Sequence, residues 1–284
     1  MRPFLRWPGG KRWLTSDLAQ AIGDLTGDYI EPFLGGGALF FALKPKTGLL
    51  SDINPRLIEL YNEIKTEPRR LKQLLRSHQR LHDHDYYYEE RARRHTKPHT
   101  RAAQLLYLNR SCFNGIYRVN RNGDFNVPIG TRSQIVMLDD DFVSISQLMK
   151  NVRVEILDFE VAINQAGQND VIYADPPYTV QHNKNGFLTY NENLFTWKDQ
   201  QRLAAALGEA RDKGARVFLS NADHESIRSL YNDGWTITEC SRHSVIAGMA
   251  TSRRKTSELL ITSEKIQTSQ LALPLDTSSD VCPP

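Results

Sequence analysis

The sequence is poor in cysteine and contains no long apolar run. Its three cysteines, Cys112, Cys240 and Cys282, lie far apart and form no CxxC pair, which argues against a disulfide framework and a zinc ribbon. No stretch of about 18 apolar residues suggests a membrane span. The N-terminal segment MRPFLRWPGGKRW lacks the apolar core of a signal peptide. We therefore expect a cytoplasmic protein that uses neither a membrane nor a metal.

The net charge of +3 is too small to indicate a partner, but its distribution is uneven. Residues 65–121 hold 14 Lys and Arg against 5 Asp and Glu, an excess of +9 that leaves −6 on the rest of the chain. A segregated basic segment suits a polyanion, because neutralising phosphates releases counterions. A solvated helical face would give the same count, so charge alone leaves both interpretations open.

Two separated parts of the chain, residues 1–65 and 150–262, alternate short apolar runs with helical periods. This alternation predicts an α/β fold with a mainly parallel sheet and helices on both faces. Strands are expected over 48–52, 152–157, 170–174 and 215–220, with a closing pair over 235–245 and 258–262.

The stretch between these parts, residues 66–149, has a different composition. It is basic and rich in His and Tyr, with helical periods followed by a loop-like segment from Asn109 to Arg118. The Asn122-Gly123 pair is a tight-turn signal and predicts a β-hairpin. We expect an inserted domain here, and a flexible tail over 263–284, which is polar with Pro and Ser.

The strongest chemical motif is Asp175-Pro176-Pro177-Tyr178, directly after an apolar strand. The exocyclic nitrogen of adenine is a poor nucleophile because its lone pair is delocalised into the ring. A carboxylate and the Pro176 carbonyl, accepting the two amino hydrogens, would expose that lone pair. Tyr178 offers a π-face for an extruded base. The alternative is a simple strand-ending turn, which Asp-Pro often makes.

A second motif, EPFLGGG over residues 31–37, places glycines after a predicted strand, where the backbone can approach a cofactor closely. Asp52 follows 17 residues after Gly35 at the end of the next strand. A carboxylate there can accept ribose hydroxyls, although Asp52 could equally cap a helix. Together the two predict a nucleoside-binding edge.

Two further segments are candidates for binding a cofactor and DNA. Arg6-Trp7-Pro8-Gly9-Gly10-Lys11 offers an aromatic ring and a lysine as a wall for a charged cofactor, although an N-terminal aromatic is more often part of a core. The hairpin of residues 109–130 carries Asn and Arg suited to reading base edges in a DNA groove. An ordinary hairpin with solvated arginines is the alternative.

In order, WPGGK, EPFLGGG, SDIN, NRSCFNGIYRVNRNGDFNVPIG and ADPPY closely resemble the Dam family of DNA adenine methyltransferases, in the motif order of its alpha group. The resemblance covers about residues 3–262. It implies a Rossmann-like methyltransferase sheet with an inserted recognition domain, S-adenosylmethionine as cofactor and double-stranded DNA as partner. The expected target sequence is GATC. A cognate restriction endonuclease and a nucleoid-associated location are further expectations.

The resemblance also assigns residues. Asp175, Pro176, Pro177 and Tyr178 match the catalytic motif. The expected cofactor-binding residues are Trp7, Lys11, Glu31, Phe33, Gly35, Gly36, Asp52 and Asp175. The expected DNA-binding residues are Arg6, Phe113, Asn114, Ile116, Arg118, Asn120 and Pro128. Arg6 stands where the family usually has lysine and Phe113 where it has tyrosine, which concerns the preference for flanking bases rather than the reaction.

The expected reaction is direct in-line transfer to a flipped adenine, without a covalent enzyme intermediate. Cytosine carbon-5 methylation would need a thiolate, and the sequence has no Pro-Cys loop. The remaining alternatives are methylation of cytosine N4 or of adenine in RNA, a nicotinamide-dependent dehydrogenase, and an inactive DNA-binding homologue. The dehydrogenase lacks GxGxxG and leaves the DPPY motif unexplained.

Overall fold

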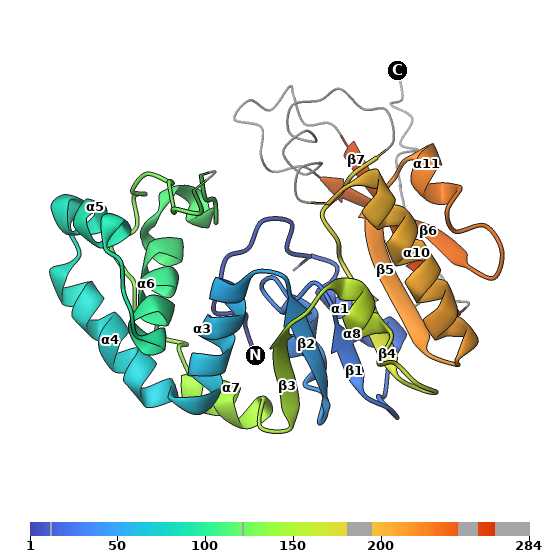
Figure 1. Cartoon of the computed structure of the whole chain (residues 1–284), viewed down its shortest axis with the longest axis horizontal. Coiled ribbons are helices and arrows are strands. Elements are labelled where there is room, and N and C mark those ends of the chain that lie inside the picture. The colour runs from blue at the N-terminus through green and yellow to red at the C-terminus, as the bar shows by residue number, and fades with distance from the viewer. Residues whose placement is uncertain (12, 121, 181–194, 244–254, 265–284) are drawn as a thin grey trace, which may run out of the picture.

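A seven-stranded sheet forms the centre of the protein, in the order β3-β2-β1-β4-β5-β7-β6 (Figure 1). The computed structural model describes residues 1–11, 13–120, 122–180, 195–243 and 255–264. The strands are β1 (Tyr29–Glu31), β2 (Gly48–Asp52), β3 (Val152–Ile156), β4 (Val171–Ala174), β5 (Arg216–Ala222), β6 (Thr236–His243) and β7 (Lys255–Thr262).

Strands β1 to β5 pair in parallel, and β7 lies antiparallel between β5 and β6. Parallel neighbours require crossover connections, which the helices between successive strands supply. The expected closing pair of strands is confirmed by the pairing of β6 with β7. The expectation of a Rossmann-like methyltransferase sheet is thereby confirmed.

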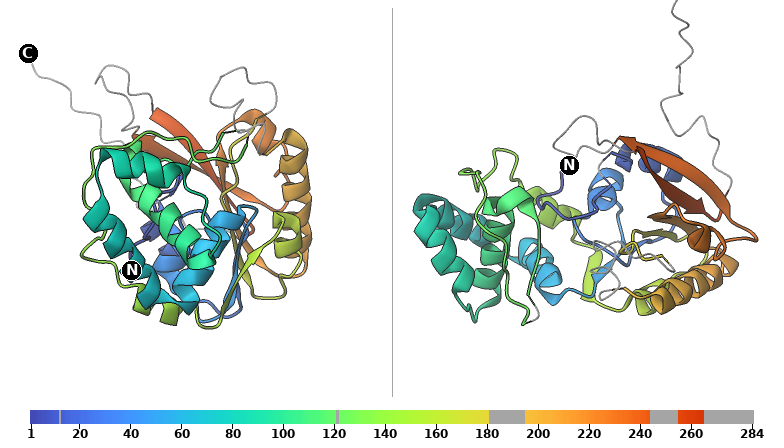
Figure 2. Two further views of the ribbon diagram at one scale, coloured as in Figure 1. Left: turned by 60° about the vertical axis from the view of Figure 1, so that its left-hand side comes forward. Right: turned by 90° about the horizontal axis from the view of Figure 1, so that it is seen from above.

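Helices cover both faces of the sheet (Figure 2). One hydrophobic cluster joins alternate strand residues such as Tyr29, Leu50 and Tyr173 to α1, α2 and α3. The other cluster joins the intervening residues, such as Ile30 and Ile172, to α8, α10 and α11. These helices are α1 (Thr15–Ile22), α2 (Ala38–Leu43), α3 (Pro55–Thr66), α8 (Phe159–Ile163), α10 (Trp197–Asp212) and α11 (Glu225–Arg228). The period of two along each strand therefore sorts its side chains between two layers.

The insertion, residues 66–149, enters the chain between α3 and β3 and lies to one side of the sheet (Figures 1 and 2). Its elements are α4 (Pro68–Leu81), α5 (His84–Ala92), α6 (Pro98–Ser111), the short 3₁₀ helix η1 (Phe113–Gly115) and α7 (Phe142–Leu148). Helix α3 packs against both α6 and α7. The hydrophobic cluster on the α3 side of the sheet continues into α4, α5 and α6, so the insertion is anchored on a shared core.

The loop-like interpretation of residues 109–118 was wrong at its start. Helix α6 continues to Ser111, because Asn109 and Arg110 are fully or almost fully buried and make tertiary contacts that their polar character had not suggested. Arg110 donates to both carboxylate oxygens of Asp140, at 2.6 Å each, and to the carbonyl of Phe4 at 3.0 Å. It is a structural residue rather than a hairpin arginine.

The predicted hairpin exists in a short form. Val119 and Phe125 form an isolated antiparallel bridge around the Asn122-Gly123 turn, and the amide of Asn120 donates to the Asp124 carbonyl at 2.8 Å. The tail expected over 263–284 falls almost entirely outside the described residues, since only its first two residues are described. No described helix is long and apolar enough to span a membrane.

Candidate functional site

Three carboxylates meet at one edge of the sheet. Glu31 ends β1, Asp52 ends β2, and Asp175 directly follows β4. Because β1 lies between β2 and β4 and all three strands run in parallel, their carboxyl ends open on the same side. Burial raises the pKa of Glu31 most, and the charges of Asp175 and Asp52 raise it further, so Glu31 lies within electrostatic range of both aspartates.

Asp52 is held by the backbone in front of it. One oxygen accepts the amide of Gly35 at 3.1 Å and the other the amide of Asn54 at 2.9 Å. The helix-cap alternative for Asp52 is wrong, because Asn54 caps α3 through the amides of Arg56 and Leu57. Each carboxylate oxygen keeps a second lone pair for a ligand hydroxyl.

The glycine loop lies close to Trp7. Gly35 has φ +45°, and a Cβ there would lie 2.8 Å from Cδ1 of the Trp7 indole; at Gly36 it would lie 3.4 Å from the Trp7 Cβ. A larger residue at position 35 would therefore displace the indole or the loop. The structure shows a close approach of the glycine loop to Trp7, and a close approach to a cofactor stays a prediction.

Asp175 shares a buried cation with Glu258. The Lys11 ammonium lies 3.5 Å from Asp175 and 2.9 Å from Glu258, and 4.4 Å from the centroid of the Tyr178 ring. Tyr178 donates its hydroxyl to Glu258 at 3.2 Å. Burial raises the pKa of Asp175 to about 6, while Lys11 opposes this and Glu258 adds to it. The segments around residues 11, 175 and 258 thus form one charged cluster.

Glu31 is the most deeply buried of the three carboxylates. Only 3% of it is exposed, and it accepts the hydroxyl of Tyr29 at 3.0 Å. Burial raises its pKa to about 8, against the opposing effect of this hydrogen bond. Glu31 is therefore mainly protonated at neutral pH, and a cation bound nearby would favour its ionised form.

Phe33 belongs to an aromatic cluster beside the glycine loop. Its ring stacks on Phe159 with centroids 5.4 Å apart, and its edge contacts Phe195 at 5.6 Å. Ile53, which follows Asp52, is 72% exposed although it is apolar. Exposed apolar surface next to the Asp52 carboxylate suits a planar group.

The N-terminal segment connects this edge of the sheet with the hairpin. Trp7 stacks on Tyr117 with centroids 4.9 Å apart and planes 18° apart. Asn109 accepts the amide of Arg6 at 3.1 Å and donates to its carbonyl at 2.8 Å. The Arg6 side chain also packs closely on Gly115, whose φ is +67°. A Cβ on residue 115 would lie 2.4 Å from Cδ of Arg6.

Most of the predicted DNA-binding residues are presented to solvent. Phe113 is 52% and Ile116 39% exposed, although both are large and apolar. Asn114 adopts a left-handed conformation, with φ +55°. Arg118, also exposed, donates from Nε to the Asn126 side chain at 2.8 Å, which orients the guanidinium.

The other two hairpin residues differ in role. Pro128 is exposed. The side chain of Asn120 accepts the amides of Asn122 and Asp124, both at 2.9 Å. Asn120 therefore shapes the turn, and a direct role in contacting DNA stays a prediction.

Sequence reasoning missed three residues of this region: Glu258, Tyr117 and Ile53. Glu258 lies on the closing strand, more than 80 positions after Asp175, and only the sheet order brings it to Lys11. Tyr117 lay within the quoted hairpin motif, but its partner Trp7 is far away in the sequence, so their contact could not be seen there. Ile53 lay inside the quoted SDIN motif, which was the available signal, and its exposure is seen only in the structure.

Known proteins resemble this chain over most of its length. A family model described as D12 class N6 adenine-specific DNA methyltransferase matches residues 7–249. The type II methyltransferase M1.LlaDCHI of Lactococcus lactis subsp. cremoris is 35% identical over 271 residues, covering 92% of this chain and 95% of the relative. DNA adenine methylases of Haemophilus influenzae and Escherichia coli are 33% and 29% identical, covering 81% and 91% of this chain and 83% and 94% of the relatives.

These matches span the glycine loop, the insertion and the DPPY motif together. They favour adenine in DNA over cytosine, RNA and the dehydrogenase chemistry considered from the sequence, and an enzyme over an inactive homologue. The resemblance seen in the sequence is thereby confirmed: this chain belongs to the D12 class of N6 adenine-specific DNA methyltransferases.

Proposed function

We propose that this enzyme transfers a methyl group from S-adenosylmethionine to adenine N6 within GATC in duplex DNA, after flipping the adenine out of the helix. The observation that carries the proposal is the convergence of Asp52 and Asp175 on either side of Glu31, at neighbouring strand ends. One carboxylate of this edge suits a nucleoside ribose and the other a base amino group.

The cofactor fits the groups present at this edge. Asp52 would accept the ribose hydroxyls, beside the backbone of Gly35 and Gly36. Glu31 suits the ammonium of the methionine part, because a cation bound beside this buried carboxyl would favour its ionised form. Trp7, Phe33 and Lys11 complete the proposed set, with Asp175 at the boundary with the base. S-adenosylmethionine, when bound, supplies an electrophilic methyl group on sulfonium sulfur.

The catalytic residues act on the adenine amino group by hydrogen bonding and position. Asp175 and the Pro176 carbonyl accept its two hydrogens and direct the nitrogen lone pair outward, while Pro177 restricts the backbone. The Tyr178 ring stacks on the base, and Lys11 keeps Asp175 ionised. Holding the nitrogen in line with the methyl group supplies much of the rate.

The recognition residues are proposed on the hairpin and the N-terminal segment. Arg118 donates to guanine O6 and N7 in the major groove. Phe113, Ile116 and Pro128 contact or wedge base steps, and Asn114 and Asn120 offer amide groups. Arg6, fixed by Asn109 next to the hairpin, reaches the first guanine. We propose residues 66–149 as the recognition domain and 1–65 with 150–262 as the catalytic domain.

Two variants test the assignment. Purified protein is incubated with plasmid and labelled S-adenosylmethionine, and the product is cut with GATC nucleases that differ in methylation sensitivity. We expect Asp175→Ala to keep DNA binding, and to keep cofactor binding through Asp52 and the rest of the proposed set, but to lose turnover; near-normal turnover would refute its catalytic role. We expect Arg118→Ala to methylate with relaxed sequence choice; unchanged selectivity would contradict the hairpin assignment.

We propose that the enzyme acts on nucleoid DNA in the cytoplasm, either alone or beside a cognate restriction endonuclease. A type II methyltransferase is among its relatives. If a partner nuclease exists, it should cut the unmethylated form of the site that the plasmid assay identifies.

A further inference from the structure

The basic character of the insertion is only partly explained by its internal contacts. Several of its arginines are bound within the protein: Arg91 to the Val127 carbonyl, Arg94 to Asp124, Arg101 to Glu59 and Arg110 to Asp140. These contacts support the hairpin and the packing on α3. The positive charges that remain identify which surface is available for a polyanion.

Helix α4 carries three such charges in a row, called here the α4 stripe: Arg69, Lys72 and Arg76. Their spacing of three and four residues places them on one face of the helix. Arg69 and Arg76 are exposed, and within the described part of the chain neither forms an ion pair or a side-chain hydrogen bond. Two guanidinium groups are therefore free to bind an external ligand.

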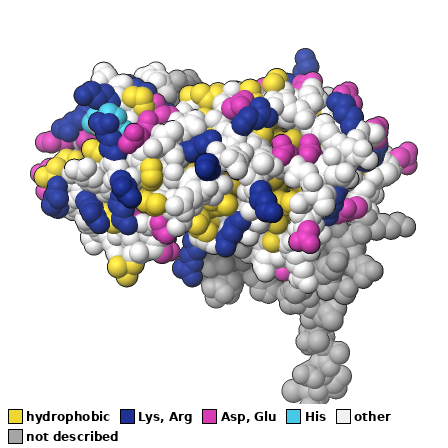
Figure 3. Space-filling view, turned by 90° about the horizontal axis from the view of Figure 1, so that it is seen from below, with side chains coloured by type: hydrophobic (Ala, Val, Ile, Leu, Met, Phe, Trp, Pro, Cys, Tyr) yellow, Lys and Arg dark blue, Asp and Glu magenta, His cyan; other side chains and the backbone are white. Residues whose placement is uncertain are grey.

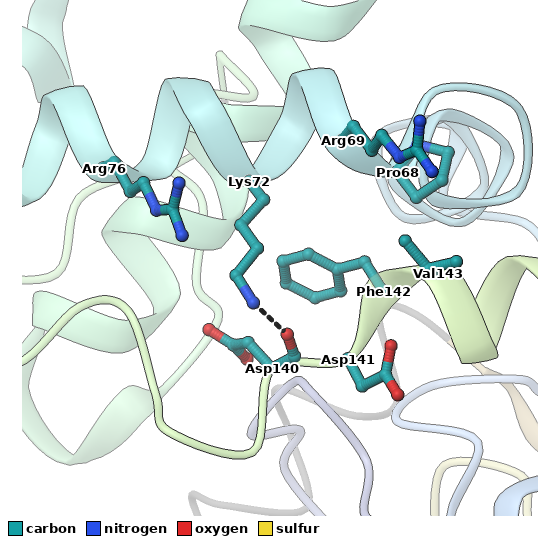
Figure 4. A pocket seen from close by; sticks show the side chains of 8 residues that line it. All are labelled: Pro68, Arg69, Lys72, Arg76, Asp140, Asp141, Phe142 and Val143. Atoms are coloured by element: carbon teal, nitrogen blue, oxygen red, sulfur yellow. Dashed lines mark hydrogen bonds between the residues drawn. The ribbon is translucent and has the colours of Figure 1, made fainter.

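The α4 stripe borders a groove of about 280 Å³ between α4 and the start of α7 (Figure 4). Phe142 and Val143 give the groove an apolar lining. Lys72 donates to the backbone carbonyl of Asp140 at 2.6 Å, so its charge is not neutralised by that contact.

The acidic residues of the groove do not cancel the stripe. The Asp140 carboxylate is matched by Arg110, with both oxygens bound. Asp141 is the remaining acidic residue of the lining, and its carboxylate accepts the amide and hydroxyl of Ser144 at 3.0 and 2.6 Å. The three cations of the stripe therefore outnumber the one carboxylate, that of Asp141, that is not paired with an arginine, and the groove is positive.

The length of the α4 stripe suits a phosphate backbone. Seven residues of helix from Arg69 to Arg76 span about 10 Å at 1.5 Å per residue. Each strand of duplex DNA carries a phosphate about every 3.4 Å along the helix axis, and these phosphates lie farther apart along the winding strand, so the stripe is long enough to reach more than one phosphate. A planar, forked guanidinium matches phosphate oxygens well.

Helix α4, which carries the α4 stripe, lies apart from the hairpin in the insertion. Helices α4 and α7 lie along the lower edge of the insertion in Figure 1, whereas the segment around η1 lies at its upper edge. In the view from below, several Lys and Arg side chains lie across the left part of the molecule, on the same side as the insertion in Figure 1 (Figure 3). We propose that the α4 stripe is a second, sequence-independent contact for the phosphate backbone of duplex DNA, separate from the stretch that the hairpin reads.

The test compares two double variants of equal charge change. Arg69→Gln/Arg76→Gln removes the free guanidinium groups and keeps Lys72, which is bound to Asp140. Lys46→Gln/Lys213→Gln, at exposed positions outside the insertion, is the control. Binding to a 40-bp duplex without a target site is measured between 50 and 200 mM salt, and methylation is measured on a 14-bp duplex with one target site.

We expect the arginine variant to bind the 40-bp duplex more weakly, with a salt slope smaller by roughly 2, because two phosphate contacts are lost. Its methylation of the 14-bp duplex should stay within about twofold of the unaltered enzyme. A salt slope equal to that of the lysine control would overturn the proposal. An equal loss on the 14-bp duplex would also overturn it, since the arginines would then act where DNA is read.

Discussion

Replacing Lys11 by glutamine should move the acidic limb of the pH–rate profile upward. In the proposed reaction Asp175 accepts a hydrogen bond from the amino group, so its ionised form is the active one. With a pKa of about 6, activity of the unaltered enzyme should fall as the pH drops through about 6. Lys11 lowers this pKa, and without its charge Asp175 should hold its proton to a higher pH.

The expected displacement can be worked from the ion pair. Two unit charges 3.5 Å apart attract by about 5 kcal/mol at an effective dielectric constant of about 20. Side chains and water rearrange when the charge is removed, so we take about half of this energy as the net effect on Asp175. At 1.36 kcal/mol for each unit of pKa, the limb should move by roughly two pH units, to about pH 8.

The assay is kcat/KM for labelled methyl transfer between pH 5 and 9.5. Lys11→Gln should have about a tenth of its plateau rate at pH 7 and recover as the pH rises, whereas Lys11→Arg should keep the original limb. A profile for Lys11→Gln that is uniformly lowered, with its midpoint still near 6, would refute the assignment of the limb to Asp175 and of its tuning to Lys11.

Three further variants test other contacts. Tyr117→Ala should raise the KM for S-adenosylmethionine by roughly 2- to 10-fold, because a stacked aromatic pair contributes about 0.5–1.5 kcal/mol; Tyr117→Phe should be near normal, and Tyr88→Ala, a half-buried tyrosine elsewhere in the insertion, is the control. Glu31 has a pKa raised to about 8, so its neutral form favours folding below pH 4.5 and this contribution is lost as the pH rises through 8. The unfolding free energy of Glu31→Gln should therefore rise relative to that of the unaltered protein as the pH increases over this window, by up to about 5 kcal/mol, and the Tm measured at each pH should follow. A difference that does not change with pH would contradict the burial argument. Arg110→Ala leaves Asp140 buried and unpaired and should cost roughly 3–5 kcal/mol in urea unfolding; Arg110→Met/Asp140→Leu should recover much of that, and equal losses in both variants would point to packing instead.

Much of the sheet could be predicted because local pattern and sheet position agree. The apolar runs at 48–52 and 170–174 are short, lie between turn residues and become buried strands. The carboxylates at their ends follow the general rule that ligands bind at the carboxyl ends of parallel strands. Asp52 and Asp175 could therefore be chosen from the sequence alone.

Other parts depended on contacts between distant segments. Nothing local to Arg110 indicates that Asp140 will neutralise it, so its position in α6 was mistaken for a loop. Glu258 reads as an ordinary strand residue until the antiparallel β7 brings it to Lys11. Likewise, Tyr117 and Trp7 are 110 positions apart, and their stacking depends on how the insertion docks.

Because the insertion leaves the chain after α3 and returns just before β3, the sheet receives both of its ends at one margin. Lengthening a connection between fixed ends costs little entropy, so the insertion, which we propose as the recognition domain, can be exchanged while the strands keep their order. A transplanted insertion would need to reproduce only three contacts: its packing against α3, the hydrogen bonds of Asn109 to the Arg6 backbone, and an aromatic ring that stacks on Trp7. Such grafts offer a route by which one catalytic domain could be directed to new target sequences in DNA.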